Sequence, residues 1–135
     1  MATLTKEIFN LAEQRAFGQP YPVYINNLRE IGVERYIVNV SSSDRRIFSA
    51  SHDPVLELPG TEEPLVCAEI FEEASVKNAL HRTQTGQSDY PTFMKEIAAA
   101  GVHFYNADLL NRVVTYFGKN ASDKYAESVP NTTTE

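Results

Sequence analysis

Two stretches of the chain resemble each other: YPVYINNLREIGVERYIV at 21–38 and YPTFMKEIAAAGVHFYNA at 90–107. They share five identities in 18 positions, where about one is expected from average residue usage. In each, Tyr-Pro opens a run of apolar residues at helical spacing, because proline suits the first turn of a helix. Each run stops at a glycine, Gly32 or Gly101, and glycine readily takes the backbone conformation that follows a helix C-terminus. Alternation typical of a strand follows. We therefore predict that the chain contains two copies of one structural unit.

The same periodicities predict the other elements on either side of these stretches. They indicate helices at about 4–16 and about 64–82, and strands at 33–40, 45–50, 54–58, 102–109, 112–117 and 124–129. Within the strands, Tyr36 and Tyr105 should face the same side of the sheet, while Ile37 and Asn106 face the other. Ser41–Asp44 and Leu110–Asn111 are predicted hairpin turns.

The resulting fold class is α+β, built from an internally duplicated helix-helix-strand-strand(-strand) unit. One unit has too few strands to be stable by itself. We therefore expect a single domain over residues 1–135, made of two repeats at about 3–59 and 65–130. Related by a pseudo-twofold axis, they would pack four helices on about four to six mostly antiparallel strands. The tail at 131–135 has no apolar residue and is expected to fray.

Charge and cysteine content exclude several classes of protein. The chain has 12 Lys and Arg against 18 Asp and Glu, with no basic cluster, so we expect no nucleic-acid partner. A single cysteine, Cys67, rules out an intramolecular disulfide and favours a reducing compartment, here the cytoplasm. No apolar run approaches the length of a membrane span, and no signal peptide precedes the first helix.

Catalytic and metal-binding motifs are missing from the sequence. His52, His81 and His103 are scattered, and a zinc site needs three or four ligands at short spacing. No nucleophile elbow or glycine-rich phosphate loop occurs either. We expect no metal and no cofactor, and the sequence leans against an enzyme without excluding one.

Polar residues that recur in both copies are the candidate binding residues: Tyr36 with Tyr105, Asn39 with Asp108, and Arg45 with Arg112 in matching turns. In one interpretation, a ligand-binding cleft near the axis is lined by Tyr36, Asn39, Tyr105, Asp108 and Arg112. In the other, which we favour, the tyrosines belong to the core and Asn39 and Asp108 terminate strands.

The favoured function is a non-catalytic module that binds a protein partner or assembles with itself, as a homodimer for example. The strand face carrying Arg35, Ile37, Phe104 and Asn106 would form the contact. The alternative is a small-molecule binder or weak enzyme with a cleft between the two repeats. The sequence identifies neither a ligand nor a partner, so the biochemical function is unknown at this stage.

The order of motifs resembles a small bacterial family, the YbcV-like domain-of-unknown-function group, which is often labelled phage envelope protein. The resemblance spans nearly the whole chain and rests on Ile70, Phe71, Ala74, Gly86, Tyr90, Pro91, Phe93, Gly101, Val102, Tyr105, Asp108, Val114, Thr115, Tyr116, Gly118 and Pro130. It implies no catalytic residues. The envelope label does not suit a sequence without a signal peptide or a membrane span, whereas a phage origin is compatible with protein binding.

Overall fold

A computed structural model describes residues 5–15, 21–49, 56–60, 63–85, 87–120 and 122–128, without the side chains of Tyr21 and Gln84. Several predictions fall outside these residues: the end of the first helix at 16, the start of the strand at 54–58, His52, Gly86, Pro130 and the tail at 131–135.

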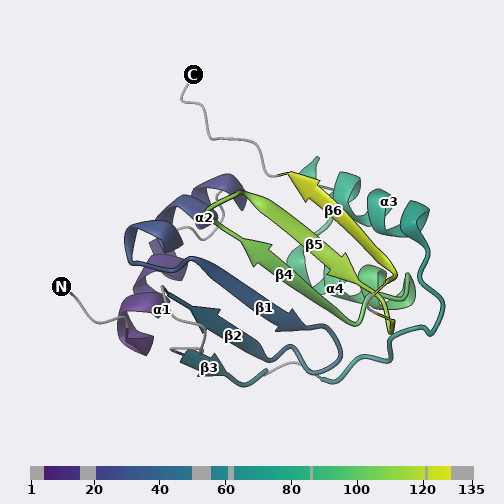
Figure 1. The fold of residues 1–135 in the computed structure, drawn as a ribbon, viewed down its shortest axis with the longest axis horizontal. Helices are drawn as coiled ribbons and strands as arrows, with labels where there is room; N and C mark the ends of the chain where they lie inside the picture. Colours follow the sequence, from purple (N-terminus) through teal and green to yellow (C-terminus); the bar gives the residue numbers. More distant parts are fainter. Residues whose placement is uncertain are drawn as a thin grey trace.

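The described residues form four helices and six strands, and the order helix-helix-strand-strand-strand occurs twice (Figure 1). The elements of the first unit are α1 (Lys6–Arg15), α2 (Tyr21–Glu30), β1 (Arg35–Asn39), β2 (Arg45–Phe48) and β3 (Leu56–Leu58). Those of the second are α3 (Glu73–Gln84), α4 (Tyr90–Ala99), β4 (Phe104–Asp108), β5 (Val113–Phe117) and β6 (Lys124–Ser128). The α+β class is confirmed.

All six strands form one antiparallel sheet in the order β3-β2-β1-β4-β5-β6. The two units meet where β1 pairs with β4, with Ile37 opposite Asn106 at the centre. On either side of that pair, Tyr36 lies opposite Ala107 and Val38 opposite Tyr105. The register is therefore the same when read from either unit, as a twofold axis through the central pair requires.

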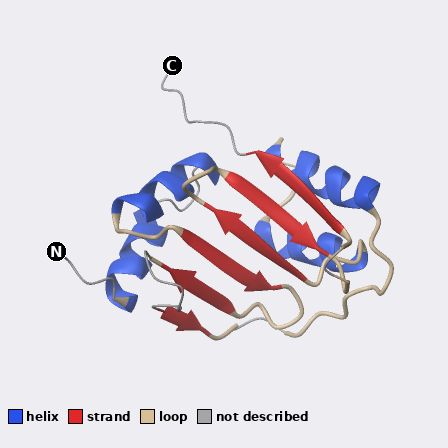
Figure 2. Cartoon of the chain, viewed as in Figure 1, coloured by secondary structure: helices blue, strands red, loops and turns tan. Residues whose placement is uncertain are grey.

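The helices pack on one side of the sheet, behind the strands in Figures 1 and 2. Burial alternates along the strands accordingly, since Tyr36, Val38, Tyr105 and Ala107 are buried and their neighbours in sequence are not. These side chains join the helix residues in one hydrophobic core. The predicted orientation of the strands is confirmed.

The helix predicted at 64–82 begins later, at Glu73, so the earlier boundary was wrong. Residues 63–72 have no regular structure, because their backbone groups are bound to distant parts of the chain. The amide of Leu65 donates to the carbonyl of Ser41 (2.8 Å), and that of Ala68 donates to the carbonyl of Ala98 (2.9 Å). An apolar pattern alone does not reveal such hydrogen bonds.

Gly32 and Gly101 end α2 and α4 with positive φ angles of 98° and 91°, as the predicted helix ends require. Their surroundings differ. A Cβ on Gly32 would meet no atom within 4 Å, whereas one on Gly101 would lie 2.2 Å from the carbonyl oxygen of Ile70. Gly101 therefore also allows the segment at 63–72 to approach the end of α4.

Alanine at each glycine should separate these two roles. Gly32→Ala should lower the free energy of unfolding by about 1–2 kcal/mol, the cost of a strained φ angle. Gly101→Ala should lower it by about 3–5 kcal/mol, because the backbone at Ile70 must also move. Urea denaturation of the two variants measures both losses. Equal losses would contradict close packing of residue 70 against Gly101.

Candidate functional site

Tyr36 and Tyr105, two of the five predicted site residues, lie side by side on the helix-covered face. Their ring centroids are 6.4 Å apart with an interplanar angle of 72°, the edge-to-face geometry that aromatic pairs prefer. Both side chains are buried, with 3% and 5% of the residue exposed. The tyrosines thus belong to the core at the junction of the two units.

Asn39 and Asp108 are the last residues of β1 and β4, each directly before a hairpin turn, and Arg112 lies in the turn after β4. The Oδ1 atom of Asn39 accepts the amide of Ser42 (3.2 Å), and that of Asp108 accepts the amides of Leu110 and Asn111 (both 3.1 Å). Because β1 and β4 are antiparallel, Asn39 and Asp108 lie at opposite ends of the central strand pair. The structure does not bring them together.

Arg112 occupies the β4–β5 turn with a φ of 58°, as Ser43 does in the β1–β2 turn with 67°. Its guanidinium donates to Oδ1 of Asn26 on α2 (3.0 Å). Arg45, which the sequence matched to Arg112, lies instead within β2. That match was therefore wrong, because the two arginines do not occupy equivalent positions.

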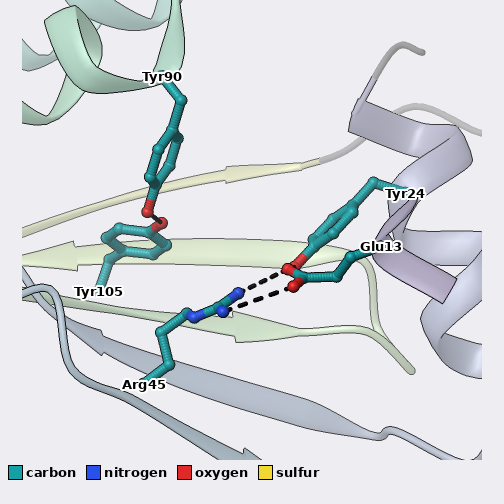
Figure 3. Close-up of polar contacts among 5 residues, drawn as sticks. All are labelled: Glu13, Tyr24, Arg45, Tyr90 and Tyr105. Atoms are coloured by element: carbon teal, nitrogen blue, oxygen red, sulfur yellow. Dashed lines mark hydrogen bonds and ion pairs between the residues drawn. The ribbon is translucent and has the colours of Figure 1, made fainter. Parts of the chain in front are cut away.

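A charged group lies on the helix-covered side of β2 (Figure 3). Nη1 of Arg45 donates to Oε2 of Glu13 on α1 (2.6 Å), and Nη2 donates to Oε1 (3.5 Å). The hydroxyl of Tyr24 on α2 donates to the same Oε2 atom (2.7 Å). About a quarter of each charged side chain is exposed, 28% for Arg45 and 27% for Glu13.

A tyrosine pair faces this charged group from the second unit (Figure 3). The hydroxyls of Tyr90, at the start of α4, and Tyr105, on β4, are 3.0 Å apart. Tyr90 is 53% exposed as a residue, but its hydroxyl points inward toward Tyr105. We call Glu13, Tyr24, Arg45, Tyr90 and Tyr105 the polar cluster; it joins elements of both units.

The electrostatics of the polar cluster keep its charges fixed. Burial disfavours the charged form of Arg45, but the hydrogen bond and negative charge of Glu13 outweigh it and raise the pKa of Arg45. Burial likewise raises the pKa of Tyr90, although its bond to Tyr105 and the charge of Arg45 act in the opposite direction. Arg45 is therefore always charged, and Tyr90 is protonated at neutral pH.

The second unit has apolar residues where the first has the charged group. Glu13 is the eighth residue of α1, and the eighth residue of α3 is Leu80. Tyr24 is the fourth residue of α2, and the fourth residue of α4 is Phe93. Leu80 and Phe93 both belong to the buried core.

The strand position agrees with this comparison. Arg45 pairs with Val38, which corresponds to Ala107 in the symmetric central register. Ala107 pairs in turn with Val114, another buried core residue. The charged group of the first unit thus corresponds to Leu80, Phe93 and Val114 in the second.

Such a difference is informative because partly buried ion pairs are expensive to form. The loss of hydration offsets most of the attraction, and well-packed apolar residues of similar size are often at least as stabilising. The second unit shows that this fold packs its helices on its strands with apolar residues. The charged group of the first unit thus departs from the apolar packing that the second unit has at the equivalent positions.

The sequence analysis did not identify Glu13 and Tyr24, and it considered Arg45 only as the counterpart of Arg112, because it searched for polar residues shared by both copies. Glu13 and Arg45 are 32 residues apart and form no local motif. At the constant spacing of the two copies, Tyr24 corresponds to Phe93 and Arg45 to Val114, so a search for positions that are polar in one copy and apolar in the other would have found these two.

The opposite face of the sheet carries the residues that the sequence assigned to partner binding. Arg35, Ile37, Phe104 and Asn106 do lie on this side, where no described element covers them. The rings of Phe104 and Phe117 stack with centroids 4.8 Å apart, and the Arg35 guanidinium lies 3.7 Å from the centroid of the Phe48 ring. We call this side of the strands the open face.

Two further classes of site have no structural support within the ranges given above. No three His, Cys, Asp or Glu side chains of the described residues gather into a group that would hold a metal ion. No helix among them is long and apolar enough to cross a membrane.

The structure thus defines a two-layer α+β protein with a polar cluster where its two units meet. The chain belongs to the family described as Protein of unknown function (DUF1398), whose model matches residues 8–128. This agrees with the resemblance to an uncharacterised domain family. No curated protein matches the chain significantly, and no specific activity is known for the family.

Replacing the charged group with its counterparts from the second unit tests whether it is structural. The triple variant Glu13→Leu, Tyr24→Phe, Arg45→Val should be as stable as the native protein or more so. Arg45→Val alone should cost about 1–3 kcal/mol, because the Glu13 carboxylate loses its partner. Urea denaturation gives the free energy of unfolding of each variant. A triple variant less stable than Arg45→Val alone would show that the charged group stabilises the fold.

Proposed function

We propose that this protein binds a small polar molecule at the polar cluster and does not transform it. The observation that carries the proposal is the charged group Glu13–Tyr24–Arg45 at positions where the second unit has apolar residues. If these positions served folding alone, apolar residues like those of the second unit would be sufficient.

The polar cluster is accessible to a ligand. Tyr90 is half exposed, and the Arg45 and Glu13 side chains are each about a quarter exposed. Arg45 is also held in place by its bonds to Glu13, which lowers the entropy that binding must overcome. The cluster therefore has the fixed polar groups on which recognition depends.

Binding is favoured over catalysis by the protonation states in the cluster. A general acid or base works best with a pKa near the working pH. The pKa values of Arg45 and Tyr90 are both raised above ordinary values that already lie far above neutrality. Neither group is suited to exchange a proton during a reaction at neutral pH.

We also propose that the two units are copies of one ancestral unit, and that the first copy acquired the charged group. Five identities at a constant spacing and the symmetric central register support this origin. The single cysteine supports a cytoplasmic location.

A thermal-shift screen tests the proposed function. Sugars, amino acids, nucleosides, carboxylates and phosphates are added to the native protein, the triple variant Glu13→Leu, Tyr24→Phe, Arg45→Val, and the control Asp108→Asn. At 100 times its Kd a ligand contributes about 2.7 kcal/mol, which raises the Tm by roughly 5–15 °C. The shift should vanish in the triple variant and persist in Asp108→Asn. A shift equal in all three proteins would contradict binding at the polar cluster.

Self-association through the open face is a second candidate function. The stacked pair Phe104–Phe117 and the half-buried Ile37 lie there, and a second copy offers the same surface. Six strands of about five residues give roughly 500 Å² per copy, or about 1,000 Å² in a face-to-face dimer. This is near the lower limit for a specific interface, so a weak dimer is expected.

Sedimentation velocity at increasing concentration tests the dimer. The native protein should dimerise in the micromolar range, whereas the double variant Arg35→Glu, Phe104→Asp should stay monomeric, because it buries like charges in the interface. Lys119→Glu changes charge outside the strands and serves as the control. A native protein that is monomeric at all concentrations would exclude self-association and leave a different protein partner as the remaining use of this face.

A further inference from the structure

The net charge of the polar cluster restricts its ligand. It contains one cation, Arg45, and one anion, Glu13, in direct contact. An anionic ligand at Arg45 would lie beside the Glu13 carboxylate, and a cationic ligand at Glu13 would lie beside the Arg45 guanidinium. Either arrangement brings like charges together in a partly buried place, where repulsion is strong. The cluster therefore favours a neutral ligand.

The hydrogen-bonding capacity of the pair specifies the ligand further. A guanidinium has five N–H donors, of which Arg45 uses two on Glu13. Oε2 of Glu13 accepts from both Arg45 and Tyr24, while Oε1 accepts a single long bond of 3.5 Å. Unused donors thus lie next to an oxygen that can accept another bond. A hydroxyl group fits this pattern because it both donates and accepts.

The aromatic ring of Tyr90 lies beside this ion pair and favours a ligand that also has an apolar face. The Tyr90 hydroxyl is held by Tyr105, whose ring contacts Tyr36 and Tyr116 with centroids 6.4 and 5.4 Å away. Tyr90 is thereby held in one orientation while half of the residue stays exposed. Its ring offers an apolar face beside a polar pair, and a matching ligand has the same amphipathic shape.

We propose that the ligand is a neutral sugar, bound through neighbouring hydroxyls to Arg45 and Glu13 with its C–H face against Tyr90. A pyranose ring combines vicinal hydroxyls, zero charge and a flat apolar face. This inference rests on the proposed function and adds the ligand class to it. A flat, neutral heterocycle lacks the adjacent hydroxyls, and a sugar phosphate or sugar acid brings the negative charge that Glu13 opposes.

The test uses the full chain and titrations with neutral monosaccharides: glucose, galactose, mannose and xylose. Glucose 6-phosphate, glucuronate, glucosamine and uracil are the competing classes. A neutral sugar at about 50 times its Kd should raise the Tm by roughly 5–10 °C, and calorimetry gives the Kd. Charged derivatives of the same sugar should bind at least tenfold more weakly.

Three variants assign the contacts. Arg45→Lys keeps the charge but loses the planar donor arrangement, so affinity should fall at least tenfold. Tyr90→Ala removes the aromatic face and should cost a similar factor. Tyr90→Phe keeps that face and should lose less than Tyr90→Ala. Denaturation of each variant without ligand establishes that it is folded.

The possible outcomes separate the sugar from the site. If a charged derivative or uracil binds and Arg45→Lys abolishes that binding, the proposed ligand class is wrong. The proposed function, binding of a small polar molecule at the polar cluster, would then still hold. Sugar binding that Arg45→Lys and Tyr90→Ala leave unchanged would overturn the contacts proposed for it. If neither the neutral sugars, nor the four competing ligands, nor any compound of the wider screen binds in an Arg45-dependent way, both proposals are overturned.

Discussion

The antiparallel pairing of β1 with β4 is the interaction on which the rest of the structure depends. Each unit alone has only three strands of three to five residues, and its strand at the centre of the full sheet, β1 or β4, would be left as an unpaired edge. Pairing Ile37 with Asn106 joins them into six strands and sets the register of everything on either side. Because side chains alternate along a strand, that register also places Tyr36 and Tyr105 together beneath the helices. A shift by one residue would place Tyr36 and Tyr105 on opposite faces of the sheet.

The local patterns of the sequence predicted most of this fold, because short-range physics determines them. Pro22 and Gly32 mark the limits of one helix, and the alternation around Tyr36 gives the buried face of a strand. The start of α3 was not predictable in this way. Leu65 and Ala68 fit a helical pattern, but their amides bind carbonyls of Ser41 and Ala98. Those partners lie 24 and 30 residues away in the sequence.

The candidate site was predictable only in part, for a related reason. Tyr105 was expected at the junction of the units and lies there. Its partner across the cluster is a pair, Glu13 and Arg45, that lies far apart in sequence and has no charged counterpart in the second unit. The spacing of the two copies in the sequence matches Arg45 with Val114, and the register of the sheet agrees with it. Glu13 and Leu80 lie outside the matching stretches, so their equivalence needs the helix bounds of the structure.

The two kinds of polar residue in this fold consequently have different uses. Asn39 in the first unit and Asp108 in the second occupy equivalent positions, and the side chain of each accepts backbone amides of the turn that follows it. These two polar residues therefore stabilise the same hairpin turn in both units. The charged group occurs once, at positions where the other unit shows that apolar residues suffice. Comparison of the two units thus distinguishes polar residues that have an equivalent in both, such as Asn39 and Asp108, from the charged group, whose counterparts in the second unit are apolar.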